Sequence, residues 1–254
     1  MKNRIEQSTG IKENWFNDWF DTGFYHRLYA HRDEKEAANF IDELVSELQP
    51  KPFASILDLG CGNGRHAKQL GAKGFNVTGL DLAHSSIREA KRWETEALHF
   101  YRHDMRHPFG KDYFDYVFNF FTSFGYFTDS ENQQVIRNIS DSLKVEGKVV
   151  VDYMNASFAE KCLVPNDEKE VDGIVYHLTR WADEKYIYKK IVIDDVQPGE
   201  PFNYTEKVAK FTVEDFQAMF DKSGLQLKNV YGDYALNDYS AETSPRLILI
   251  AQKV

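Results

Sequence analysis

The chain has 254 residues, of which 42% are hydrophobic and 28% charged, and its formal net charge is −9. This length suits one large α/β domain, and the acidity disfavours broad electrostatic binding to nucleic acid or to an anionic membrane. Only two cysteines are present, Cys61 and Cys162, and the sequence shows neither an apolar signal core nor a bilayer-spanning run. We therefore expect a cytoplasmic protein without a membrane anchor or a disulfide framework.

The N-terminal part of the chain is predicted to be helical. Residues 11–32 are rich in aromatic side chains and precede any clear core strand. A helix is predicted over 33–50, because Asp33 and Glu36 form a capping-box-like start and Pro50 stops it. Residues 1–50 are therefore treated as a separate N-terminal helical segment.

From residue 53 onward, short apolar runs alternate with amphipathic stretches. The predicted strands cover 53–59, 75–81, 98–104, 114–120 and 147–154, and the predicted helices cover 65–74, 85–96 and 130–144. Repeated strand–helix–strand units at this spacing predict a doubly wound, mostly parallel sheet with right-handed crossovers.

The pattern changes after this region, where three extended runs follow one another without a helix. They occupy 171–181, 185–196 and 203–211. Such runs predict a small antiparallel β insert at about 155–211. A helix that Thr212 caps and two further strands finish the chain, at 213–224, 225–234 and 245–253. Residues 51–254 are thus expected to form one α/β domain that carries the insert.

The stretch "DLGCGNG" joins the first of these strands to the helix that follows it. Glycines stand at positions 60, 62 and 64, so the backbone can turn tightly and admit a ligand without a Cβ in the way. A dinucleotide-binding loop would need its third glycine at position 65, where this chain has Arg65. The spacing therefore argues against an NAD(P)-dependent oxidoreductase.

This loop resembles the nucleotide-binding loop of class I S-adenosylmethionine (SAM)-dependent methyltransferases, and the resemblance is close over residues 53–153. It implies a seven-stranded sheet, SAM as the cofactor, S-adenosylhomocysteine (SAH) as the product, and no metal. The loop residues that it assigns to the cofactor site are Asp58, Gly60, Cys61, Gly62 and Gly64. Asp58 would orient the loop and the ammonium end of SAM, and Cys61 would serve as a small packing residue.

The same resemblance extends to the ends of the later strands. Asp81 ends the second strand, where a carboxylate can accept hydrogen bonds from both ribose hydroxyls. Asp104, after the third strand, would meet the adenine amino group. The other cofactor-binding residues that the resemblance implies are Leu82, Met105, Asn119 and Phe120.

The acceptor site is expected beside the aromatic run "NFFTSFGYF" at 119–127, where the family builds the floor of its substrate site. The candidate substrate-binding residues are Phe124 and Tyr126 in this run and Tyr25 in the N-terminal segment. The alternative is that these aromatic side chains belong to the core.

The N-terminal segment also supplies the candidate catalytic residues. The family often folds the segment before its first strand over the cofactor as a lid. His26, Tyr29 and His31 could then act as the base if the acceptor is a hydroxyl or a carboxyl group. The alternative is an amphipathic helix that packs its aromatic side chains on the sheet.

The predicted function is transfer of a methyl group from SAM to a small molecule by in-line displacement. DNA is not an expected substrate, because the run at 119–127 lacks the two prolines of the DNA adenine methyltransferase signature. The alternatives are a methyltransferase acting on tRNA or another macromolecule, and a SAM-binding protein without catalytic activity. The insert is expected either to roof the acceptor site or to mediate a homodimer.

Overall fold

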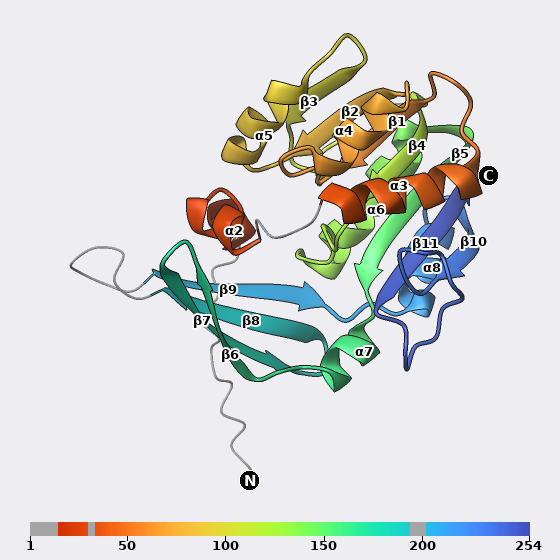
Figure 1. Cartoon of the computed structure of the whole chain (residues 1–254). Helices are drawn as coiled ribbons and strands as arrows, with labels where there is room; N and C mark the ends of the chain where they lie inside the picture. Colours follow the sequence, from red (N-terminus) through yellow and green to blue (C-terminus); the bar gives the residue numbers. More distant parts are fainter. Residues whose placement is uncertain (1–14, 30–33, 194–201) are drawn as a thin grey trace.

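The computed structural model describes residues 15–29, 34–193 and 202–254. His31 and Asp33 lie outside these ranges, so what the sequence predicts for them stays a prediction. Figure 1 shows a large sheet flanked by helices and a smaller sheet beside it.

The large sheet has seven strands in the order β10-β11-β5-β4-β1-β2-β3. They are β1 (Ser55–Leu59), β2 (Asn76–Asp81), β3 (Leu98–Arg102), β4 (Phe114–Asn119), β5 (Leu143–Met154), β10 (Leu225–Tyr231) and β11 (Arg246–Lys253). β1 to β5 pair in parallel, whereas β11 runs antiparallel to β5 and β10. The predicted mostly parallel seven-stranded sheet is confirmed. The strand order reverses between β1 and β4, which marks the point where α/β sheets bind their ligands.

Successive side chains of a strand point to opposite faces of the sheet, and in these strands the side chains on both faces are mostly apolar. Helices therefore cover both faces. On one face, Leu57 of β1 belongs to the same core cluster as Ile139 of α6 and Phe216 of α8. On the other face, Ile56 clusters with Ile41 of α3 and with residues of α4 and α5. These helices are α3 (Glu34–Leu48), α4 (Arg65–Ala72), α5 (His84–Ala90), α6 (Asp129–Ser142) and α8 (Val213–Asp221).

The predicted helices end earlier than the sequence suggests, and the local reason is clear for two of them. The helix expected over 85–96 ends at Ala90 and continues only as a 3-10 turn, η1 (Lys91–Trp93). The chain has already turned back by Thr95, whose N–H donates to the Leu98 carbonyl at 3.0 Å. The helix expected over 130–144 ends at Ser142, because Leu143 pairs with β4 and begins β5.

The insert is a four-stranded antiparallel sheet in the order β6-β7-β8-β9. Its strands are β6 (Asn166–Val171), β7 (Ile174–Ala182), β8 (Tyr186–Ile193) and β9 (Phe202–Ala209), and the helix α7 (Ala156–Lys161) precedes them. The sequence predicts neither β6 nor α7. β6 reads "NDEKEV" and is largely exposed at the sheet edge, so it shows no alternating apolar signal.

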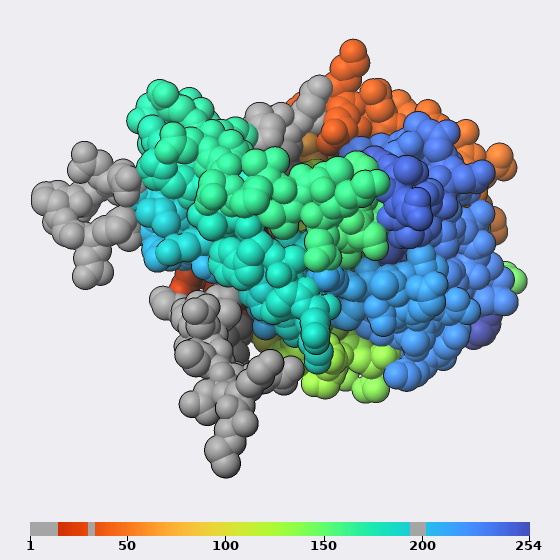
Figure 2. All heavy atoms as spheres, turned by 90° about the horizontal axis from the view of Figure 1, so that it is seen from below, coloured from red at the N-terminus to blue at the C-terminus, as the bar shows by residue number. Residues whose placement is uncertain are grey.

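The N-terminal helices α1 (Trp15–Trp19) and α2 (Gly23–Leu28) pack against the insert, and α2 lies between the insert and α5 (Figure 1). The Trp19 and Tyr204 rings lie 4.8 Å apart, and the Tyr176 hydroxyl donates to the Phe24 carbonyl at 3.2 Å. Figure 2 shows from below that the insert and the C-terminal segment form one continuous surface. None of the helices in the described ranges is both long and apolar enough to cross a membrane.

Candidate active site

A cavity of about 510 Å³ lies where β1, β2 and β4 end, a volume typical of small-ligand sites. Its walls include many of the residues that the sequence assigns to the cofactor: Gly60, Cys61, Gly62, Asp81, Leu82, Asp104, Met105 and Phe120. A second group of lining residues is aromatic: Trp15, Phe16, Phe20, Tyr25, Tyr29, Phe121, Tyr126 and Phe127. The cavity therefore joins a glycine-rich wall to an aromatic one.

At two of the three glycines in the turn after β1, neighbouring side chains occupy the space that a Cβ would need. Gly60 has φ of +79°, and a Cβ added there would lie 2.7 Å from the Ser123 Cβ. Gly64, the N-cap residue of α4, has φ of +82°, and a Cβ there would lie 2.7 Å from the Phe100 ring. Gly60 thus lets the loop lie against the segment after β4, whereas Gly64 lies behind the cavity wall and sets the packing of α4.

Asp81 connects the glycine turn to the end of β2. Its carboxylate accepts the Gly62 N–H and the Ala83 N–H, each at 2.8 Å. Burial raises the pKa of Asp81 above its ordinary value, and these backbone donors act against that rise. The carboxylate also lines the cavity, where a ligand hydroxyl can reach it.

Asp58 is a buried carboxylate with no hydrogen-bond partner for either oxygen among the described residues. It is 1% exposed and lies behind the glycine turn rather than on the cavity wall. Burial and then the negative charge of Asp81 raise the pKa of Asp58 to about 7. A buried group left without a partner calls for a cationic or hydrogen-bonding ligand, or for water, nearby.

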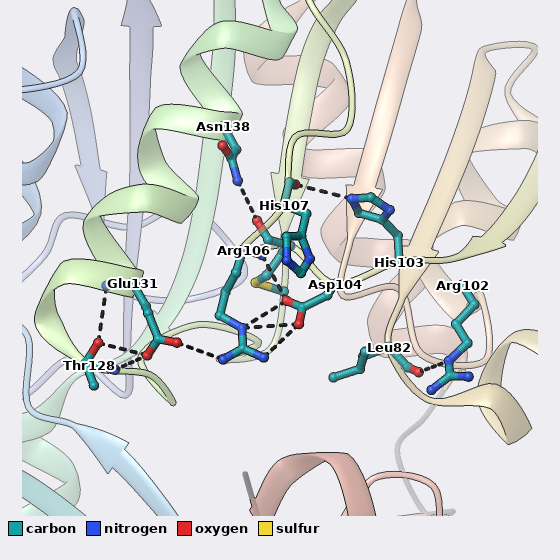
Figure 3. Close-up of polar contacts among 10 residues, drawn as sticks. Leu82, Arg102, His103, Asp104, Arg106, His107, Thr128, Glu131 and Asn138 are labelled. Carbon is teal, nitrogen blue, oxygen red and sulfur yellow. Dashed lines mark hydrogen bonds and ion pairs between the residues drawn. The ribbon is translucent and has the colours of Figure 1, made fainter. Parts of the chain in front are cut away.

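Asp104 lies on the cavity wall, but its carboxylate is engaged by Arg106 (Figure 3). Arg106 donates Nε to Oδ1 at 3.1 Å and Nη2 to Oδ2 at 2.7 Å, and its Nη1 donates to Glu131 at 2.8 Å. Burial opposes ionisation, but the hydrogen bonds from Arg106 prevail and lower the pKa of Asp104. The Met105 carbonyl accepts the Asn138 amide at 3.0 Å, so the whole turn is fixed by neighbouring side chains.

The aromatic run after β4 divides between the cavity and the core. Phe120 and Tyr126 line the cavity, whereas Phe124 is 1% exposed and packs 5.6 Å from the Phe216 ring. Phe124 therefore belongs to the core, which corrects the substrate-binding prediction. Asn119 also lies behind the wall, where its Nδ2 donates to the Leu59 carbonyl at 2.7 Å and holds the end of β1.

The N-terminal helices bring three of the predicted acceptor-side residues, Tyr25, His26 and Tyr29, to the cavity. His26 Nε2 lies 3.0 Å from the Ser85 hydroxyl, and burial lowers the pKa of His26. His26 is thus largely a neutral imidazole near pH 7, the form that can accept a proton.

Comparisons of the sequence and of the fold with known proteins point to methyltransferases. A family model described as "Methyltransferase domain" matches residues 56–147. A Bacillus subtilis (strain 168) protein named "Putative methyltransferase YqeM" is 28% identical over 239 residues, which cover 90% of this chain and 94% of that protein. An S-adenosylmethionine-dependent methyltransferase from Clostridium acetobutylicum superposes with a TM-score of 0.75 at 18% identity, over 91% of this chain and 96% of that one. Residues 56–147 thus match a methyltransferase-domain family, and the chain as a whole has the fold of class I SAM-dependent methyltransferases.

A second solved methyltransferase has the same fold as this chain over nearly the whole length of both proteins. It is the SAM-bound CalS10, an amino pentose methyltransferase from Micromonospora echinaspora, with a TM-score of 0.67 and 21% identity over 92% of this chain and 98% of that one. The shared length includes the region of the insert.

The cavity of this methyltransferase also holds a carboxylate that sequence reasoning missed. Glu206 of β9 lines the cavity and accepts the Trp19 indole N–H and the Tyr29 hydroxyl, each at 2.8 Å. Lys189 of β8 contacts the Tyr29 hydroxyl and lies 3.4 Å from Glu206. No local motif marks Glu206, because its partners stand 177 and 187 residues away in the chain.

The methyltransferase shows no group of three or more His, Cys, Asp or Glu side chains placed to hold a metal ion within the part of the chain that the structure describes. Cys61 is buried in the glycine turn, and burial raises the pKa of its thiol well above the ordinary value. A thiol of that kind stays protonated near neutral pH, which is consistent with a packing role.

Proposed function

We propose that this methyltransferase acts on a small-molecule acceptor that binds at the aromatic end of the cavity. The proposal rests on one observation: a glycine turn, two carboxylates at strand ends and an aromatic wall all line the same cavity. The structural similarity to an amino pentose methyltransferase supports an acceptor of modest size. The segments 15–29 and 202–209 cover the aromatic end and act as lid and roof in this proposal.

The residues around the glycine turn fit SAM. Asp81 lines the cavity, where its carboxylate can accept hydrogen bonds from the ribose hydroxyls, and the charge of ionised Asp58 behind the glycine turn would favour the ammonium group of the methionine end. A Cβ at Gly62 would meet nothing within 4 Å, so the backbone there leaves room for that end of the cofactor. The proposal places the adenine ring beside Met105, with Arg106 holding Asp104 as part of that wall.

SAM, when bound, supplies a methyl group on a sulfonium; the lone pair of the acceptor forms the new bond while the C–S electron pair passes to sulfur and leaves SAH. The chain contributes by aligning the acceptor and by excluding water, and this in-line reaction gains most from those two effects. The acceptor proton is proposed to pass to the Tyr29 oxygen as Tyr29 passes its own proton to Glu206.

The cofactor part of this proposal predicts that SAH stabilises the protein and that NAD does not. At an SAH concentration 100 times the dissociation constant, mass action adds about 2.7 kcal/mol to the free energy of unfolding. For a chain of this size, this corresponds to a rise in Tm of roughly 5–10 °C. Thermal unfolding with SAH, with NAD and without ligand checks the prediction, and a shift with NAD alone would reverse the choice of cofactor.

The acceptor part is tested by measuring SAH formation from SAM with a pool of small metabolites and, separately, with bulk tRNA. We expect turnover with the small-molecule pool. Tyr29→Phe should bind SAH as the unmodified chain does but form SAH at least tenfold more slowly, because one general base contributes ~10²–10⁴-fold. Turnover with tRNA alone would overturn the choice of acceptor class.

Asp58 makes SAH binding depend on pH. Because the pKa of Asp58 is about 7 in the ligand-free protein and an ammonium neighbour favours the carboxylate, the affinity for SAH should rise about tenfold from pH 6 to pH 8. The stability of the ligand-free protein should depend on pH in the opposite direction. The folded state holds the Asp58 proton more tightly than the unfolded chain does. The contribution of Asp58 to the free energy of unfolding therefore falls as pH rises from about 4 to about 7.

Calorimetry at pH 6, 7 and 8 measures this dependence on the unmodified chain and on Asp58→Asn. The variant keeps the size of the side chain and has no group to titrate, so its affinity should vary much less over this range. An equal slope in both proteins would show that another group is responsible.

A further inference from the structure

One ion pair joins the neighbouring strands β11 and β5 and contacts the segment after β4. Arg246 of β11 donates Nε to Asp152 Oδ1 at 2.7 Å, and its Nη2 lies 2.6 Å from the same oxygen. Asp152 is 1% exposed, and its other oxygen accepts the Phe121 N–H at 2.8 Å and the Tyr234 hydroxyl at 3.2 Å. The pair therefore extends beyond the sheet to the backbone of residue 121.

The segment that this pair contacts has a backbone conformation that its residues disfavour. Phe121 and Thr122 have φ of +56° and +58° in succession, a left-handed conformation that is unfavourable for residues with a Cβ. Such a conformation persists when its surroundings fix it. Here the Thr122 N–H donates to the Asp152 carbonyl at 2.9 Å, and the Thr122 hydroxyl accepts from Arg246 at 3.1 Å.

The same segment forms the cavity wall beside the glycine turn. Residues 120–123 line the cavity, and the Ser123 hydroxyl donates to the Gly60 carbonyl at 3.4 Å. The Phe121 ring lies near two guanidinium groups, with its centroid 5.5 Å from the Cζ of Arg246 and 5.8 Å from the Cζ of Arg65. A shift of residues 121 and 122 would therefore move the wall against which Gly60 packs.

We propose that Asp152 and Arg246 are positioning residues for the cofactor cavity: together they hold residues 121 and 122 in the left-handed turn that shapes its wall. Neither residue lines the cavity. Their effect on binding is carried by the backbone of the turn, and it rests on the proposed binding of SAM in this cavity.

The test uses Arg246→Lys, which keeps the charge but lacks the planar fork that reaches both Asp152 and Thr122. We expect the SAH dissociation constant, measured by calorimetry, to rise about tenfold, as for the loss of about 1.4 kcal/mol of hydrogen bonding. A milder variant, Thr122→Val, removes only the hydroxyl that meets Arg246 and should raise the dissociation constant in the same direction. The matched control is Lys253→Gln, at the other end of β11. It breaks the ion pair between Lys253 and Asp112, neither of which lines the cavity, and should leave the constant unchanged.

A second measurement does not depend on SAH at all. In the ligand-free protein, the amide hydrogens of Phe121 and Thr122 should exchange at least tenfold faster in Arg246→Lys than in the unmodified chain or in Lys253→Gln. If the unmodified chain does not bind SAH, the proposed function fails while this exchange result still decides the role of the pair. Unchanged amide exchange in folded Arg246→Lys, or an SAH dissociation constant within twofold of the unmodified value, would overturn the inference.

Discussion

Replacing Asp81 by alanine is expected to weaken SAH binding by about 100-fold or more, the largest loss from any single side chain of the site. The carboxylate is proposed to accept both ribose hydroxyls, and hydrogen bonds to a charged group contribute about 1.5–3 kcal/mol each. The same carboxylate holds the Gly62 and Ala83 amides, so its loss also loosens the glycine turn.

Calorimetry with SAH measures this loss, and circular dichroism shows whether the variant is folded. Asp115→Ala is the matched control, because Asp115 also accepts a backbone N–H, that of Ser55 at 2.8 Å, but does not line the cavity. Its affinity for SAH should be unchanged even if its Tm falls. A folded Asp81→Ala protein that binds SAH within threefold of the unmodified chain would remove Asp81 from its proposed role.

Replacing Gly60 by alanine should damage both stability and binding. The new Cβ would lie 2.7 Å from Ser123, in addition to the cost of a φ of +79°. We expect the free energy of unfolding to fall by about 2–4 kcal/mol and SAH binding to weaken at least tenfold, since the turn and the wall must move apart.

The control for this experiment separates the backbone cost from the steric one. Gly74 has φ of +87°, yet a Cβ there would meet nothing within 4 Å. Gly74→Ala should therefore lose only about 1–2 kcal/mol and bind SAH normally. Urea unfolding and calorimetry on both variants give the comparison, and equal losses would show that contact with Ser123 has no part in the effect.

The cofactor side of the site could be predicted from sequence because its signals are local. A buried strand, a glycine turn and a helix follow one another in "DLGCGNGRH", and Asp81 and Asp104 each stand just after a predicted strand or at its end. Parallel strands carry their carboxyl ends to one edge of the sheet, so the positions converge without further information. Asp58 and Gly64 nonetheless lie behind the wall, a depth that the motif does not specify.

The acceptor side could not be predicted in the same way, because its contacts join distant parts of the chain. Glu206 meets Trp19 and Tyr29 only after the insert folds back on the N-terminal helices. Arg246 and Asp152 are 94 positions apart in the sequence and meet only because β11 pairs with β5 in the sheet. The role of Phe124 was open for the same reason: only the fold brings Phe216 against it.

Glu206 has a consequence for how such enzymes diversify. The family model covers residues 56–147, whereas the carboxylate and both of its donors lie outside that stretch. Under the proposed function, residues within the matched stretch bind the methyl donor, whereas the segments 15–29 and 202–209 determine which acceptor binds. Substitutions in these two segments could then change the selectivity for the acceptor without changing the residues that bind the methyl donor.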